Sequence, residues 1–255
     1  MRLKGGGALS VESKYIEYIK DKDIVLVGPA RYLIGRNKGE EIDKYDIVVR
    51  MNNSIPIPKN LEKDFGSKTN VLYHRLASQG FPQEKNIKHW CDVGLKWVVV
   101  KMQTDHKKIT KLKGLIKNHD ISWITSQKTV DELKKVMQRG PNQGVITITH
   151  LLSCPIKSLT VMGLDFYLTG YFQGYNNLTD EREIEKIREK SFHGRIHDVP
   201  SQINYLENLW KNDKRLKIDD MLEEILMKKE LLKKIETKPK TSNKINIQKK
   251  KKKKK

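Results

Sequence analysis

Short apolar runs alternate with amphipathic segments along most of the chain. The first run, IVLVG at residues 24–28, is continuously apolar and ends at Gly, which is typical of a buried parallel strand. Similar β-branched runs follow at residues 46–51, 69–74, 96–102, 121–125 and 158–163. Apolar residues recur at helical spacing in residues 11–20, 131–138, 144–152 and 199–210. This alternation predicts a Rossmann-like, three-layer α/β/α sandwich around a mostly parallel sheet.

Polar, glycine-containing segments lie next to several of the predicted strands. GPARY and MNNS follow the first two strands, GPNQG opens the helix at residues 144–152, and GLDFYLTGY follows the last strand. Such residues also form ordinary tight turns, so composition alone does not make them a site. Ligands of parallel α/β sheets, however, bind beyond the carboxyl ends of the strands. We therefore expect a ligand site where these segments meet.

Positive charge is concentrated at the end of the chain. The 255 residues carry a formal charge of +20, and the fourteen Lys and two Glu of residues 228–255 account for +12 of it. We therefore predict an N-terminal extension with a leading helix (1–22), one main folded domain (23–227) and a basic, disordered tail (228–255). The tail could bind weakly to polyanions or a membrane surface, or serve only solubility. A nucleic-acid-binding protein is less favoured, because the body lacks interleaved aromatic and basic repeats.

The sequence also bears on location. No stretch approaches the roughly 20 apolar residues that span a bilayer, and the first fifteen residues lack the apolar core of a signal peptide. Cys91 and Cys154 are the only cysteines, too few for a disulfide framework. We expect a cytoplasmic protein without a transmembrane segment.

Residues 27–56 resemble the large sialyl motif of eukaryotic-type sialyltransferases, and the spacing fits without a gap. The matching positions are Val27, Gly28, Leu33, Gly35, Gly39, Ile42, Asp43, Arg50, Met51 and Asn52. The similarity continues into the family's D-x-G-x-K-T pattern through Asp64, Gly66, Ser67, Lys68 and Thr69.

Two further segments carry the same resemblance. Residues 140–167 are similar to the small sialyl motif through Pro141 and Gly144, and their end, GLDFY, is similar to a segment of bacterial sialyltransferases. Residues 192–209 resemble the histidine-containing last motif of both groups, with His197 and Asp198 as the matching pair.

The resemblance implies an A-type glycosyltransferase variant that needs neither a metal nor another cofactor. Its partners would be a donor, cytidine monophosphate (CMP) linked to sialic acid or a related acid sugar, and a glycan acceptor with a free hydroxyl. The sequence Asp21-Lys22-Asp23 has the metal-binding D-x-D pattern of other transferases, but it precedes the first strand and would lie at the wrong edge of the sheet.

The resemblance also assigns roles to residues. His197 would be the general base, a role that suits an imidazole near neutral pH. Phenol groups after the last strand could hydrogen-bond the departing phosphate, and they belong to Tyr167, Tyr171 and Tyr175. The expected donor-binding residues are Gly28, Pro29, Ala30, Arg31, Asn52, Asn142, Gln143 and Gly144. Glycines there would allow close backbone approach, and amides would bind nucleotide oxygens.

The chain departs from the family pattern at several motif positions. These departures are Pro29, Ala30 and Arg31 in the first loop, Asn142 and Gln143 in the small motif, and Gln202 five residues after His197. They leave a catalytically impaired nucleotide- or glycan-binding protein of the same fold as an alternative.

A different enzyme class and a metal site have less support from the sequence. A dinucleotide-dependent oxidoreductase or a methyltransferase would share the sheet, but the G-x-G-x-x-G pattern is absent. His193 and His197 could share a metal, although Gly194 between them and the lack of a third ligand oppose this.

Overall fold

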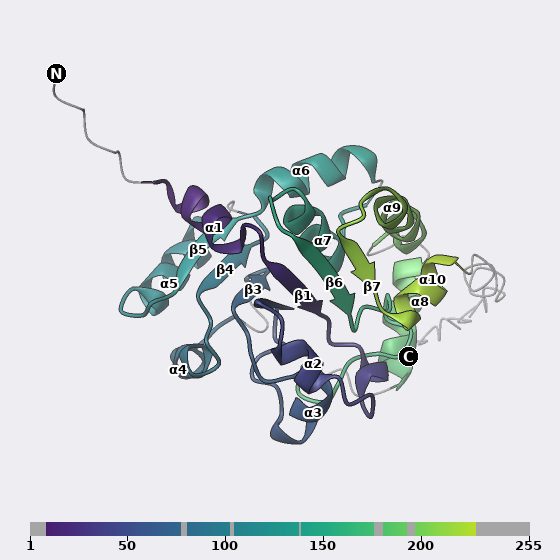
Figure 1. The fold of residues 1–255 in the computed structure, drawn as a ribbon, viewed down its shortest axis with the longest axis horizontal. Helices are drawn as coiled ribbons and strands as arrows, with labels where there is room; N and C mark the ends of the chain where they lie inside the picture. Colours follow the sequence, from purple (N-terminus) through teal and green to yellow (C-terminus); the bar gives the residue numbers. More distant parts are fainter. Residues whose placement is uncertain are drawn as a thin grey trace, which may run out of the picture.

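A single seven-stranded sheet forms the centre of the molecule (Figure 1). The computed structural model describes residues 9–77, 81–102, 105–137, 139–175, 181–192 and 197–227. The strands are β1 (Asp23–Val27), β2 (Ile47–Met51), β3 (Val71–His74), β4 (Trp97–Val100), β5 (Ser122–Thr125), β6 (Ser158–Met162) and β7 (Leu216–Ile218). Their order is β5-β4-β3-β2-β1-β6-β7, and every pairing is parallel. The six strands predicted from the sequence are confirmed, and β7 is an addition.

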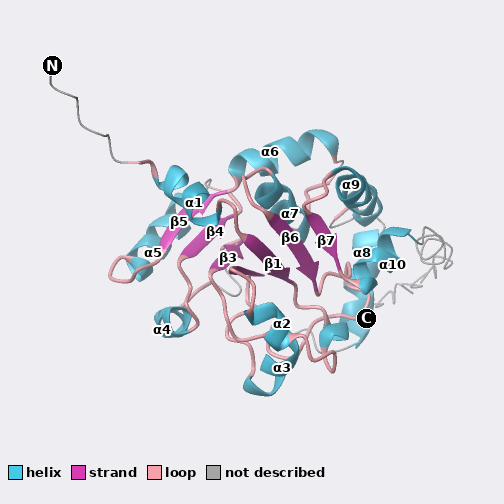
Figure 2. Ribbon diagram, in the orientation of Figure 1, coloured by secondary structure: helices cyan, strands magenta, loops and turns pink. Residues whose placement is uncertain are grey.

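Helices cover both faces of this sheet (Figure 2). They are α1 (Val11–Ile19), α2 (Gly39–Asp43), α3 (Glu62–Phe65), α4 (Glu84–Asp92), α5 (His106–Ile116), α6 (Gln127–Val136), α7 (Gln143–Leu152), α8 (Glu181–Phe192), α9 (Val199–Asn212) and α10 (Asp220–Met227). Short 3-10 turns occupy Arg31–Leu33 and Lys59–Leu61. The α/β/α sandwich expected from the sequence is therefore confirmed.

Alternation along β1 separates two of the hydrophobic clusters. Ile24 and Leu26 pack with α1, α6, α7, α9 and α10, whereas Val25 and Val27 pack with α2 and α3. A third cluster joins β3 and β4 to α4 and α5. Because both faces of these strands are buried, they read as continuous apolar runs. The leading helix α1 belongs to this core, since Tyr15 and Ile19 are fully buried.

The strand order creates a crevice at one edge of the sheet. From β1 the chain leads to β2 on one side, and β6 later returns to pair on the other side, so the order reverses between β1 and β6. A reversal of this kind marks the usual ligand crevice of an open parallel sheet. Asp23 lies at the opposite, amino edge, where its carboxylate accepts hydrogen bonds from Lys157 Nζ and Ser158 Oγ, both at 2.6 Å. The D-x-D sequence is thus far from the crevice, as expected.

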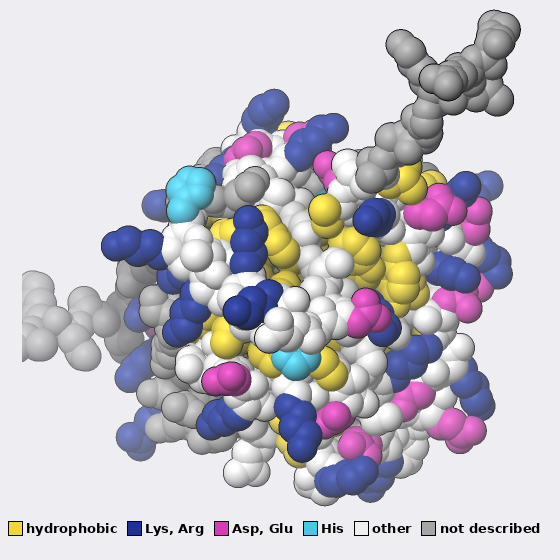
Figure 3. Space-filling model, turned by 90° about the vertical axis from the view of Figure 1, so that its left-hand side faces the viewer, with side chains coloured by type: hydrophobic (Ala, Val, Ile, Leu, Met, Phe, Trp, Pro, Cys, Tyr) yellow, Lys and Arg dark blue, Asp and Glu magenta, His cyan; other side chains and the backbone are white. Residues whose placement is uncertain are grey.

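Charge on the described surface is mixed. On the face that includes α5 and the edge strand β5, Lys and Arg side chains are scattered among acidic ones (Figure 3). Within the described part of the chain, no helix is long and apolar enough to cross a membrane. In that same part, no three His, Cys, Asp or Glu side chains gather in a way that could hold a metal ion.

Candidate active site

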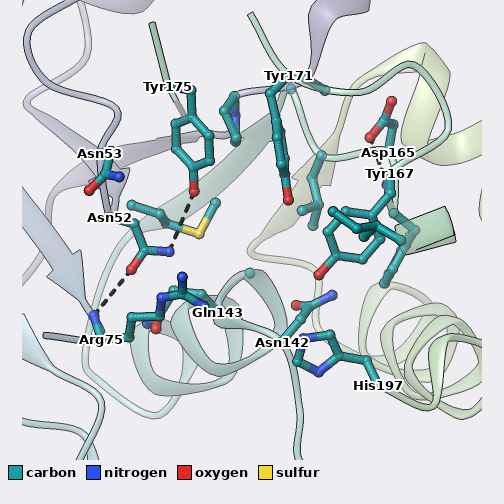
Figure 4. Close-up of a pocket in the computed structure, with 18 of the residues that line it drawn as sticks. Asn52, Asn53, Arg75, Asn142, Gln143, Asp165, Tyr167, Tyr171, Tyr175 and His197 are labelled. Carbon is teal, nitrogen blue, oxygen red and sulfur yellow. Dashed lines mark hydrogen bonds between the residues drawn. The ribbon is translucent and has the colours of Figure 1, made fainter. Parts of the chain in front are cut away.

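A cavity of about 290 Å³ opens at the carboxyl edge of the sheet, at the crevice between β1 and β6. Its lining is Pro29, Ala30, Met51, Asn52, Asn53, His74, Arg75, Ala77, Lys101, Asn142, Gln143, Gly144, Gly163, Leu164, Asp165, Phe166, Tyr167, Tyr171, Tyr175, Ile187, Ser191 and His197. Asn52 and Arg75 lie on one side, and Tyr167, Asn142 and His197 lie on the other (Figure 4). Segments from most of the chain therefore converge on one site.

Ten of the twelve site residues expected from the sequence line this cavity. They are Pro29, Ala30, Asn52, Asn142, Gln143, Gly144, Tyr167, Tyr171, Tyr175 and His197. Gly28 and Arg31 do not line it. A Cβ on Gly28 would lie 2.1 Å from the carbonyl oxygen of Gly163, so the close approach at Gly28 is to β6 and not to the cavity. Arg31 begins a 3-10 turn, and its Nη2 lies against Gly170.

The turn that carries the tyrosines is organised by a buried carboxylate. Asp165 accepts hydrogen bonds from the backbone N–H of Tyr167 at 3.0 Å and from the N–H and hydroxyl of Thr169. These bonds hold Phe166 and Tyr167 at positive φ, 51° and 73°, a region that non-glycine residues seldom adopt. The Asp in GLDFY thereby aims the Tyr167 ring into the cavity, a role that the sequence analysis does not assign.

Aromatic rings form a row along the cavity. The rings of His197 and Tyr167 are stacked with centroids 6.4 Å apart, and Tyr171 lies between Tyr167 and Tyr175 at 6.0 and 4.7 Å. Burial raises the pKa of all three phenols, so they stay protonated at neutral pH. A phenol O–H that stays protonated is a hydrogen-bond donor, which suits an anionic ligand.

His197 is fixed with one ring nitrogen available. Its Nδ1 lies 3.0 Å from the carbonyl oxygen of Gly140, and because a carbonyl only accepts, Nδ1 carries the proton and Nε2 the lone pair. Burial lowers the pKa of His197, the Gly140 contact raises it, and the nearby positive charges of Lys101 and Arg75 lower it further. The net lowering keeps the imidazole neutral at pH 7, the form that a general base requires.

Gln202 connects the two helix ends that carry Asn142 and His197. Asn142 caps α7 by accepting from Val145 N at 2.9 Å, and its own N–H donates to Gln202 Oε1 at 2.9 Å. The Gln202 side chain is fully buried and also donates to Asp198 O, beside His197. The Gln202 amide accepts one of these hydrogen bonds and donates the other. Gln202, which departs from the family pattern, therefore positions Asn142 and the segment that carries His197.

Two amide side chains contribute polar groups to the cavity. Asn52 adopts φ 49°, and its Oδ1 accepts from Arg75 N at 3.1 Å while its Nδ2 donates to Tyr175 Oη at 3.4 Å. The amide oxygen and nitrogen of Gln143 are both buried and have no hydrogen-bond partner within the described structure. Unmet polar groups in a cavity wall are costly, and a polar ligand would relieve that cost.

Two cationic side chains and a second histidine were missed by the sequence analysis. Arg75 directly follows β3, and Lys101, which follows β4, donates to Pro141 O at 3.2 Å. His74 accepts from Leu76 N, and burial lowers its pKa to about 4, so it is neutral. The strand-end rule could have identified all three, because each lies within the last two residues of a predicted strand or directly after one.

Comparison with known proteins identifies relatives of the chain. Residues 20–153 match the model of glycosyltransferase family 29 (sialyltransferase). The chain is 35% identical over 96 residues to the human CMP-N-acetylneuraminate-beta-1,4-galactoside alpha-2,3-sialyltransferase, covering 35% of this chain and 25% of that protein. It is 25% identical over 218 residues to the human CMP-N-acetylneuraminate-beta-galactosamide-alpha-2,3-sialyltransferase 4, covering 74% of this chain and 62% of that protein. The chain thus spans a quarter to about three fifths of these relatives.

A solved structure shares the architecture. The monofunctional alpha-2,3-sialyltransferase Cst-I from Campylobacter jejuni aligns with a TM-score of 0.50 and 14% sequence identity, covering 86% of this chain and 81% of that one. At this level of identity the likeness concerns the fold, and it agrees with the fold class expected from the sequence.

Proposed function

Because the chain belongs to glycosyltransferase family 29, the sialyltransferases, we propose that it transfers sialic acid from CMP-sialic acid to a hydroxyl of a glycan acceptor. The observation that carries the proposal is the cavity in which His197, the tyrosine row and Asn52 converge at the carboxyl edge of the sheet. The human relatives are named for the donor CMP-N-acetylneuraminate, which supports the same donor here.

The proposed reaction is a single displacement at the anomeric carbon. The acceptor oxygen forms a bond to that carbon as the bond from carbon to phosphate oxygen breaks. The electron pair of the broken bond passes to the phosphate oxygen, and CMP leaves. The proton of the acceptor hydroxyl passes to His197 Nε2, which the Nδ1 contact with Gly140 leaves free to accept it.

The remaining lining residues have complementary roles in the proposal. Phenols of the tyrosine row donate hydrogen bonds to the phosphate, whose negative charge grows as the sugar departs. The free amide groups of Gln143 and the fixed amide of Asn52 bind polar atoms of the nucleotide. Metal independence remains a prediction from the family resemblance.

One observation favours a binding protein without turnover. Pro29 has no N–H, and the N–H of Ala30 donates to Gly163 O at 3.1 Å. Neither residue therefore offers a hydrogen-bond donor to a phosphate, although both line the cavity. If this loss abolishes catalysis, the site would still bind CMP.

Ligand-dependent melting tests the nucleotide site. At a hundredfold excess over its Kd, CMP should stabilise the native state by about 2.7 kcal/mol and raise the Tm by several degrees, whereas NAD should leave it unchanged. The measurement is made with EDTA present, so that binding without a metal is tested at once. Equal shifts with both ligands, or none, would remove the proposed function.

Release of free CMP then separates an enzyme from a binding protein. Wild-type protein is incubated with CMP-sialic acid, with and without glycan acceptors, and with CMP linked to other acid sugars. Acceptor-dependent CMP release supports the transferase and identifies the sugar. Binding of CMP without any release supports a protein that binds the nucleotide without turnover.

The pH profile of transfer should reflect the lowered pKa of His197. A general base works in its neutral form, so kcat/KM should fall only as pH drops through the pKa of His197, which lies below the ordinary value near 6.5. Lys101→Met removes a charge that lowers this pKa, so its acid limb should move to higher pH. Lys44→Met, which removes a charge outside the cavity lining, should leave the limb in place. A wild-type limb above 6.5 would contradict the assignment.

Location and the basic tail remain predictions. The tail at residues 228–255 and His193 lie outside the described residues, so the polyanion contact and the weaker metal hypothesis are unaffected by the structure.

A further inference from the structure

Two cationic side chains line the cavity outside every sialyl motif position matched above. Arg75 lies beside Asn52 at the carboxyl end of β3, and Lys101 follows β4 (Figure 4 for Arg75). The backbone N–H of Arg75 donates to Asn52 Oδ1, which fixes the point from which the side chain extends. The Arg75 side chain itself is exposed, so its guanidinium can turn toward a ligand. Lys101 uses one of its three ammonium donors on Pro141 O.

No acid in the described cavity lining balances these charges. Asp165 is the one carboxylate there, and both of its oxygens accept hydrogen bonds from Tyr167 and Thr169 within the turn. The histidines at positions 74 and 197 are neutral, because burial lowers their pKa. The described lining therefore has a charge of +2 from two side chains and −1 from a carboxylate engaged in its own turn.

Holding the two cations near each other is unfavourable without a ligand. Burial is the main cause that lowers the pKa of Lys101, and the charge of Arg75 lowers it further. An anion placed between them would offset both the lost hydration and the repulsion. The cavity is thus prepared for negative charge.

We propose that Arg75 and Lys101 bind the phosphate of the nucleotide donor and stabilise the charge that it gains as the sugar leaves. The inference rests on the proposed function. A phosphate linked to the sugar carries one negative charge, and the released monoester carries nearly two at neutral pH. Cations beside it therefore stabilise the departing group more than the bound donor, which is the condition for lowering the barrier. They also supply the donors that Pro29 and Ala30 lack.

Paired binding measurements with CMP and cytidine isolate the phosphate. By isothermal calorimetry, Arg75→Gln and Lys101→Met should each weaken CMP binding roughly tenfold or more, the loss expected for a charge-assisted hydrogen bond. Cytidine binding should change less than about twofold in the same variants, since cytidine has no phosphate. The charge-retaining variants Arg75→Lys and Lys101→Arg should recover part of the CMP affinity.

Two matched controls remove a charge elsewhere. Arg36 is exposed on a loop, and Lys44, which directly follows α2, forms an ion pair with Glu40 at 3.1 Å; both lie outside the cavity lining. Arg36→Gln and Lys44→Met should leave CMP and cytidine binding unchanged. All variants are first compared with the wild type in thermal melting without ligand, so that misfolding is recognised.

The outcomes separate the inference from the proposed function. Unchanged CMP affinity in the Arg75 and Lys101 variants, or equal losses for CMP and cytidine, overturns the phosphate assignment while leaving the function intact. A loss that appears with a fluorinated, non-transferable donor analogue but not with CMP assigns the cations to the sugar carboxylate and overturns it too. If wild-type protein binds neither CMP nor cytidine, the proposed function fails and this inference fails with it.

Discussion

Replacing His197 with alanine is expected to lower kcat for sialyl transfer by about 10²–10⁴, the usual contribution of a positioned general base. The affinity for CMP should stay within about twofold of the wild type, because the ring binds the acceptor proton and not the nucleotide. The prediction depends on one contact, Nδ1–H to Gly140 O at 3.0 Å, which leaves Nε2 as the acceptor.

The measurement is steady-state transfer, with CMP affinity determined on the same preparations. His119→Ala is the control, because His119 is exposed and lies outside the cavity lining. It should leave kcat unchanged. Turnover in His197→Ala equal to that of the wild type would reject the base assignment. A parallel loss of CMP affinity would instead indicate that the stack with Tyr167 supports the nucleotide site.

The strands could be predicted because burial on both faces makes them uniformly apolar. β1, β2, β3, β4 and β6 have almost wholly buried residues, so their composition is distinct from that of the loops. β7 has only three residues, of which Leu216 alone is buried. Three residues are too few to show the hydrophobic pattern of a strand, and the pairing of β7 with β6 is evident only from the structure.

The site residues were predicted from sequence motifs, so residues that act outside a motif, or whose role depends on a three-dimensional contact, were not among them. Asp165 stands inside GLDFY, but nothing in the sequence shows that its carboxylate binds the N–H groups of its own turn. Arg75 and Lys101 fall on no motif position, so only the convergence of strand ends brings them to the cavity. The bond from Asn142 N–H to Gln202 spans sixty residues and has no local signal.

Gly28 illustrates the opposite case, a motif residue whose role is structural. The sequence predicts that Gly28 lets the backbone approach the sugar-nucleotide donor closely. In the structure, Gly28 instead faces Gly163 across the ends of β1 and β6. Its N–H donates to Met162 O at 2.8 Å, which continues the strand pairing up to the cavity rim. Sequence reveals that a backbone comes close at Gly28 but not which backbone it meets.

Gly28→Ala should therefore destabilise the fold strongly. The new methyl would lie 2.1 Å from Gly163 O, and Gly163 cannot retreat, because its N–H is bound to Tyr32 Oη at 2.8 Å and Asp219 Oδ2 at 3.0 Å. Overpacking of this severity costs about 3 kcal/mol or more of the free energy of unfolding. For a domain of this size the Tm should fall by about 6–12 °C.

Gly114→Ala provides the matched control for the same change of residue. Gly114 lies within α5, and a Cβ there would meet no heavy atom within 4 Å, so the substitution should raise stability by up to about 1 kcal/mol through helix propensity. Of these two variants, only Gly28→Ala should lose CMP affinity. Pushing β1 and β6 apart would displace Pro29 and Ala30, which line the cavity. If Gly28→Ala melts within about 2 °C of the wild type, less than the shift expected for 1 kcal/mol, the two strand ends are not locked together as the structure indicates.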